Sequence, residues 1–397
     1  DVATEDSWDL SSLFSDDASW EQSFTAWEES ISTCDTFRGT LADGPKPLLK
    51  YLEFDREFDR AAERLGTYSG LRFAEDVAAA KGQEMQARFR NAYSRAAEAT
   101  SFVRPELMAA GDDATRIMLE APELEPFRLM LQRILRHKPH TLSQREEELL
   151  AMQSETASTA GQVFRQLNDA DLSFGEIVND KGERIELSHS TFSAILHGPG
   201  RDVRREAFHQ YYAQYKGHEN TLAATLAGSV HKDVFYARAR NYPSALESSL
   251  FEDNVPVSVY DNLIASVRKS LPSLYRYLEV RRRAMGVDEL HQYDVYVPIL
   301  SDLSTDYPWD QASDLILESL QPLGSEYVAT LEKGLRGRWC DRYENQGKQS
   351  GAFSCGSFDG DPFILMNYQP EVLDHVFTLA HEAGHSMHSY YSAKSQP

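Results

Sequence analysis

Five residues near the end of the printed sequence, His381-Glu382-Ala383-Gly384-His385, combine side chains that can hold a metal ion and activate water. Apolar residues recur at helical spacing over 372–380, which predicts a helix running into this pattern. Side chains four positions apart share a helix face, so His381 and His385 can point in one direction. Two neutral imidazoles placed in this way can bind Zn²⁺ at about 2.0–2.1 Å each. Glu382 would then lie beside the ion, where a carboxylate can act as general base toward a zinc-bound water.

The composition excludes several other classes of protein. The 397-residue chain carries a formal net charge of −22, which argues against nucleic acid or an anionic membrane surface as its main partner. It has no apolar run of the roughly 18 residues that a membrane span needs. No Lys or Arg precedes Arg38, so a secretory signal peptide is not expected. The cysteines are few and widely spaced, as is typical of reduced thiols, and we predict a cytoplasmic protein.

Most of the chain has helical periodicity. After the candidate N-caps Asp16 and Asp17, bulky apolar residues recur every three or four positions and predict a helix. Pro256 and Pro272 each stand where a further helix could begin. Comparable patterns predict helices at 48–65, 76–100, 127–135, 201–217, 219–240, 309–320 and 325–335. The expected fold class is therefore mainly α.

Two short stretches predict β-hairpins instead. Residues 174–178 and 184–187 flank the turn 179–182, and residues 351–355 and 363–367 flank the turn signal at 359–361. The second hairpin leads directly into the helix that carries the two histidines. An edge strand beside a metal can pair with an extended peptide backbone, the strand-addition mode of recognition. The alternative is that the hairpin serves only as structural support, and the sequence leaves both interpretations open.

Several longer motifs resemble the oligoendopeptidase F family, which belongs to the thimet-oligopeptidase-like zinc metallopeptidases. The resemblance runs from one end of the chain to the other, and the stretch from 343 to 392 is the most specific part of it. The matching segments are WDLSSLF (8–14), SALESSLFEDNVPVSVYDNLI (244–264), HQYDVYVP (291–298), YENQGKQSGAFSCG (343–356), PFILMNY (362–368) and FTLAHEAGHSMHSYYS (377–392).

The resemblance implies an elongated, mostly helical, zincin-like metallopeptidase with a deep channel that admits oligopeptides and excludes folded proteins. It implies that His381 and His385 bind zinc and that Glu382 is the catalytic base of an endopeptidase. Residues from Gly351 onward would lie along the substrate, namely Gly351, Ala352, Phe353 and Ser354. The expected domains are an N-terminal helical domain, 1–187, that ends in the first hairpin, and the first part of a catalytic domain, 188–397.

One ligand expected from the resemblance has no counterpart in the printed sequence. Members of the family supply a third zinc ligand, a Glu, from a helix downstream of the paired histidines, and we expect it beyond Pro397. His388 is no substitute, because the seven residues after His381 rise about 10.5 Å along a helix. His388 either faces the substrate or is simply a polar helix residue. His291 is interpreted as structural.

Two alternatives remain. With only two histidine ligands, the chain could be a catalytically inactive fragment that binds peptides or acts as a scaffold. A related exopeptidase is the nearer alternative, and the products from peptides with blocked ends would distinguish it. Side-chain preference and oligomeric state do not follow from the sequence.

Overall fold

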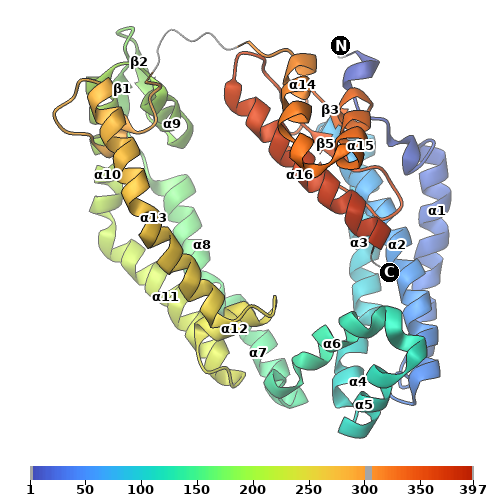
Figure 1. Cartoon of the computed structure of the whole chain (residues 1–397). Helices are drawn as coiled ribbons and strands as arrows, with labels where there is room; N and C mark the ends of the chain where they lie inside the picture. The colour runs from blue at the N-terminus through green and yellow to red at the C-terminus, as the bar shows by residue number, and fades with distance from the viewer. Residues whose placement is uncertain (1–2, 300–305, 396–397) are drawn as a thin grey trace. The chain divides into compact units, whose positions relative to one another are not determined.

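The computed structural model describes residues 3–299 and 306–395 and is mainly helical (Figure 1). The chain divides into two compact units. Unit 1 combines Asp1–Lys138 with Ser304–Pro397, and unit 2 is Pro139–Leu303. Unit 1 is therefore built from both ends of the chain, and it contains the candidate site.

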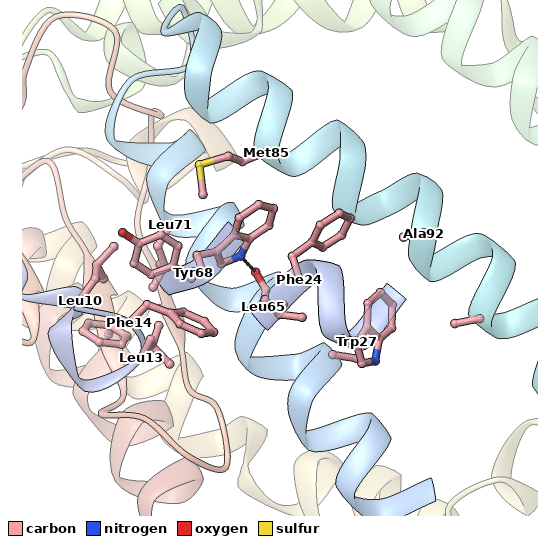
Figure 2. Close-up of a cluster of buried hydrophobic side chains, with 14 of the residues drawn as sticks. Leu10, Leu13, Phe14, Phe24, Trp27, Leu65, Tyr68, Leu71, Met85 and Ala92 are labelled. Carbon is pink, nitrogen blue, oxygen red and sulfur yellow. Dashed lines mark hydrogen bonds between the residues drawn. The ribbon is translucent and has the colours of Figure 1, made fainter. Parts of the chain in front are cut away.

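Three helices form the N-terminal part of unit 1: α1 (Asp17–Ser30), α2 (Pro45–Glu75) and α3 (Ala80–Thr100). Asp16 caps α1 by accepting a hydrogen bond from the Ser19 backbone. The predicted apolar positions of α1 are buried against α2 and α3 (Figure 2). The indole N–H of Trp20 donates to the carbonyl of Leu65 at 3.0 Å, so this aromatic cluster leaves no buried donor unpaired there.

Shorter helices complete this part of unit 1. They are α4 (Val103–Ala109), α5 (Asp112–Glu120) and α6 (Arg128–Arg136), together with 3₁₀ turns at Thr4–Asp6, Leu10–Ser12, Ile31–Phe37 and Pro122–Phe127; a further 3₁₀ turn, Lys138–His140, begins at the last residue of this part of the unit. Helices α4–α6 and the turns at Ile31–Phe37 and Pro122–Phe127 enclose a second apolar cluster with the first part of α2.

A small sheet joins the two ends of the chain within unit 1. Its strands are β3 (Cys340–Asp341), β4 (Phe353–Cys355) and β5 (Phe363–Leu365), in the order β3-β5-β4. Successive strand side chains point to opposite faces. Phe363 and Leu365 accordingly join the cluster of α1–α3, whereas Ile364 packs with α14 (Trp309–Ser319), α15 (Ser325–Arg336) and α16 (Leu373–Ser395). The sheet is thus a middle layer between two groups of helices.

Unit 2 consists of helices and one hairpin. The hairpin pairs β1 (Glu176–Val178) with β2 (Arg184–Glu186), and Gly182 in its turn has φ of +80°, which favours glycine. The helical elements are α7 (Gln144–Ala157), α8 (Thr159–Gln166), a π-turn at Leu167–Asp171, α9 (His189–His197), α10 (Arg201–Gly217), α11 (Glu219–Ala239), α12 (Ala245–Phe251), α13 (Val257–Ala284) and a 3₁₀ turn at Gln292–Asp294.

The structure confirms the mainly α fold class and both predicted hairpins. It adds β3, which is only two residues long and has no periodicity to detect. The prediction that a helix begins at Pro272 is wrong, because α13 continues through this residue. The predicted domain boundary after residue 187 falls inside unit 2, where Leu187 and Phe192 share one apolar cluster.

The motif at 291–298 has a structural role in unit 2. The Asp294 carboxylate, fully buried, accepts hydrogen bonds from Arg201 and from Arg204, whose side chain is 2% exposed. Arg281 of α13 donates to the backbone carbonyl of Asp294 at 2.8 Å. Burial would raise the pKa of Asp294, but the hydrogen bonds from Arg201, His291 and Arg204 lower it below its usual value. Asp294 therefore links α10 and α13.

Asp294→Asn should destabilise the protein by about 3–5 kcal/mol, because it leaves the buried guanidinium of Arg204 facing a neutral partner. Urea unfolding, with hydrogen exchange in α10, measures the loss. Because the folded-state pKa is lowered, the stabilisation is present above the unfolded pKa of about 3.9 and disappears as the pH falls further. Asp288→Asn, at an exposed acid nearby, is the matched control. Equal stability of the two variants would contradict the role of Asp294.

Candidate active site

Helix α16 has two chemically different faces. Its buried face contacts the sheet and consists of Val376, Leu379, Ala383, Ser386 and Met387. His381 and His385 lie on the exposed face, and Glu382 between them is half-buried. The spacing of four residues therefore places both imidazoles on one side, as predicted, while the apolar residues anchor the helix on the other.

The two imidazoles converge at their Nε2 atoms, which are 3.0 Å apart, and their planes are close to perpendicular, at 85°. Two nitrogens bound at about 2.1 Å to one tetrahedral ion lie about 3.4 Å apart. The observed separation needs only a small side-chain adjustment to reach this value. The residues present therefore fit two ligands of a zinc ion, and neutral imidazole is a donor that zinc prefers.

A polar contact fixes strand β4 against α16. The hydroxyl oxygens of Ser354 and Ser386 lie 2.7 Å apart, and Ser386 is fully buried. At the end of β4 the backbone comes so close to the helix that a Cβ at Gly356 would lie 2.6 Å from that of Ser389. The strand is therefore held in place directly beside the helix that carries the histidines.

The side chains predicted to bind substrate are mostly used for packing. Ala352 packs with the α14–α16 cluster, Phe353 with the α1–α3 cluster, and Ser354 with Ser386. Gly351 is exposed and has φ of +87°. These residues can therefore bind a peptide mainly through their backbone N–H and C=O groups.

One edge of β4 is open. In the part of the chain that the structure describes, β4 pairs with β5 alone. The N–H groups of Ile364, Met366 and Tyr368 donate toward β3, so residues 363 and 365 present theirs to β4. Phe353 and Cys355, which lie opposite residues 365 and 363, therefore direct their backbone N–H and C=O groups toward β5, because this direction alternates from one residue to the next along an antiparallel strand. The backbone groups of Ala352 and Ser354 face outward.

Two side chains that shape the approach to β4 were not predicted from the sequence. Lys348, with its side chain 1% exposed, donates to the carbonyls of Asp341, Tyr343 and Met366. Burial lowers the pKa of Lys348, and the Asp341 carboxylate opposes this shift. Asn367 donates its side-chain amide to the carbonyls of Gln349 and Gly351. No local pattern signals the contacts of Lys348 with Met366 and of Asn367 with Gln349 and Gly351, since these join segments that the sheet brings together.

His388 lies on the rim of a shallow hollow between α15 and α16, together with Tyr327, Gly384 and Tyr391. Residues 3–299 and 306–395 contain no cluster of three histidine, cysteine or acidic side chains able to hold a metal. His388 therefore belongs to no such cluster among the described residues. No helix among the described residues is long and apolar enough to cross a membrane.

The fold and the site together define a class of protein: it is mainly helical, and a small sheet supports a helix with the pattern H-E-x-x-H. The family profile of peptidase family M3 matches residues 194–397, and a profile described as Oligopeptidase F matches residues 106–174. The chain belongs to peptidase family M3.

Individual relatives agree with this assignment. The chain is 39% identical to oligopeptidase PepF of Bacillus subtilis over its whole length, and spans 59% of that relative. It is 37% identical to the group B oligopeptidase PepB of Streptococcus agalactiae, over 98% of the chain and 65% of the relative. The chain therefore spans less than two thirds of the length of these relatives.

Two solved structures show the same fold. A Chlamydophila abortus protein assigned to the peptidases superposes with a TM-score of 0.92 at 32% identity, covering 100% of this chain and 67% of that one. The oligoendopeptidase-F of Enterococcus faecium gives a TM-score of 0.61, also at 32% identity, over 95% of this chain and 64% of that one.

Proposed function

We propose that this chain is the part of a zinc-dependent endopeptidase that carries two of its metal ligands and its catalytic base, and that the complete protein hydrolyses short oligopeptides. The observation that carries the proposal is the pair of Nε2 atoms 3.0 Å apart on the exposed face of α16, next to Glu382. Membership in peptidase family M3 supports it. A cytoplasmic location remains part of the proposal.

His381 and His385 would hold the zinc ion. Bound zinc supplies Lewis acidity, which makes water a stronger acid and polarises a carbonyl group. The Glu382 carboxylate takes the proton of the attacking water and delivers it to the leaving amine. The outer edge of β4 supplies N–H and C=O groups that can hold an extended peptide, and α16 fixes that edge relative to the histidines through Ser354 and Ser386.

Cleavage of a quenched fluorescent oligopeptide by the complete protein tests the proposal. The peptide carries blocked ends, so that only internal cleavage is possible. We expect turnover that a chelator removes and zinc restores, and we expect no cleavage of a folded protein. Peptide binding without turnover by the zinc-loaded protein would contradict the proposal and favour the inactive peptide-binding alternative. Cleavage that requires a free terminus would favour an exopeptidase.

A further inference from the structure

Asn367 lies where the pairing between β4 and β5 should continue. Phe353 is opposite Leu365, so two residues further along Gly351 is opposite Asn367. Because odd-numbered residues of β5 direct their N–H groups toward β4, the N–H of Asn367 would be the next donor in this ladder. Gly351 instead adopts φ of +87°, which turns the chain out of regular strand geometry.

The side chain of Asn367 replaces the missing ladder bond. Its Nδ2 donates to the carbonyl of Gly351 at 2.8 Å and to that of Gln349 at 3.0 Å. One side-chain amide thus satisfies the carbonyls of both Gln349 and Gly351. The Gly351 carbonyl and the Ala352 N–H belong to one planar peptide unit, so this contact also fixes the direction in which the N–H of Ala352 points.

The loop before this point is fixed from its other side. Lys348 donates to Tyr343 and Met366, and the carbonyl of Gly347 accepts from Val77 of the segment after α2. Gly347 has no room for a side chain, because a Cβ there would lie 2.2 Å from an oxygen of Asp76. Gln349 is held as well, because its backbone N–H donates to the carbonyl of Ala74 at 2.9 Å. The stretch that these contacts leave unheld is 350–352, and Asn367, two residues after β5, contacts it through the carbonyl of Gly351.

We infer that Asn367 is a positioning residue that extends the peptide-docking edge of β4 to include Ala352. With Asn367 in place, the outer edge offers the backbone groups of both Ala352 and Ser354. Without it, the peptide unit that carries the N–H of Ala352 loses its holding contact, and only the Ala352 carbonyl and the groups of Ser354 keep a direction set by the pairing of β4 with β5. The inference rests on the proposed function insofar as β4 is the strand to which peptides bind.

Asn367→Asp is the sharpest test, since it replaces the donating amide by an oxygen facing two carbonyls. Asn367→Ala removes the donor without adding charge. Asn345→Asp in the same loop is the matched control: the side-chain oxygen of Asn345 accepts from the Gln346 backbone, and aspartate keeps that oxygen. Zinc content and thermal unfolding show whether each variant is folded.

Affinity is measured by fluorescence polarisation for peptides lengthened one residue at a time on either side of the same central pair. All variants are made in the complete protein carrying Glu382→Gln, so that binding is read without turnover. We expect Asn367→Asp and Asn367→Ala to weaken binding about ten- to hundredfold for peptides extended on one side. The shortest peptides and the Asn345→Asp protein should change by less than about twofold.

The outcomes separate this inference from the proposed function. An equal loss for all peptide lengths, no loss at all, or no binding of any peptide would overturn the role of Asn367. Length-dependent binding by a protein that never cleaves would sustain that role and overturn the proposed peptidase. Peptide cleavage by the parent protein, together with an equal loss of affinity for all peptide lengths in the Asn367 variants, would sustain the proposed peptidase and overturn the role of Asn367.

Discussion

Replacing Glu382 by glutamine should reduce peptide cleavage by the complete protein by about 10²- to 10⁴-fold, the range that general acid–base catalysis contributes. Glutamine has the same shape but cannot accept a proton from water. Zinc should stay bound, because Glu382 lies between the two ligands in sequence and is not itself expected to bind the ion. Steady-state kcat/KM and metal content per protein chain measure the two effects.

Variants of the two histidines provide the contrast. His381→Ala and His385→Ala each remove a metal ligand and should lose zinc and activity together. Asp374→Asn, at an exposed acid in the first turn of α16, makes the same carboxylate-to-amide change away from the histidines and should leave both intact. Loss of zinc in Glu382→Gln would show that this carboxylate is a ligand rather than a base.

Local sequence was sufficient to predict the central helix. The apolar positions of 372–380 and the spacing of His381 and His385 each depend only on the 3.6-residue period, and the structure has the predicted helix with both imidazoles on its exposed face. The hairpins were equally local, since each was indicated by turn residues between two short runs typical of strands.

Contacts between distant segments were not predictable in this way. Ser386 looks like any small polar residue of a helix until the sheet brings Ser354 to within 2.7 Å. Asn367 could not be paired with Gly351 before the register of β4 and β5 was known. The same holds for Arg204 and Asp294, which are 90 residues apart in the chain. Such partners depend on tertiary geometry, which hydrophobic periodicity does not encode.

At Pro272 a local sequence rule gave a wrong prediction. Proline favours the first turn of a helix, where its missing N–H costs nothing. In α13 it lies in the interior, and the helix continues on both sides of it. The 28-residue length of α13 supplies enough other backbone hydrogen bonds to keep the helix continuous across one missing donor.

The remaining large effect concerns the number of zinc ligands. Catalytic zinc sites normally combine three protein ligands with one water. The described residues offer two, with His388 about 10.5 Å further along the helix axis than His381. The resemblance to the oligoendopeptidase F family implies a glutamate as the third ligand, and we propose that it lies outside residues 1–397, since the relatives are longer than this chain.

Residues 1–397 alone should then bind zinc at least about a hundredfold more weakly than the complete protein, since even outer-sphere partners of a metal site account for about 10- to 100-fold. Competition with a chromophoric chelator measures the affinity, and the quenched peptide measures turnover. Adding back the remaining segment should restore both. His388→Ala in the complete protein should keep its zinc, because that side chain lies too far along α16 to reach the ion. Tight zinc binding and full turnover by residues 1–397 alone would show instead that this chain contains the third ligand.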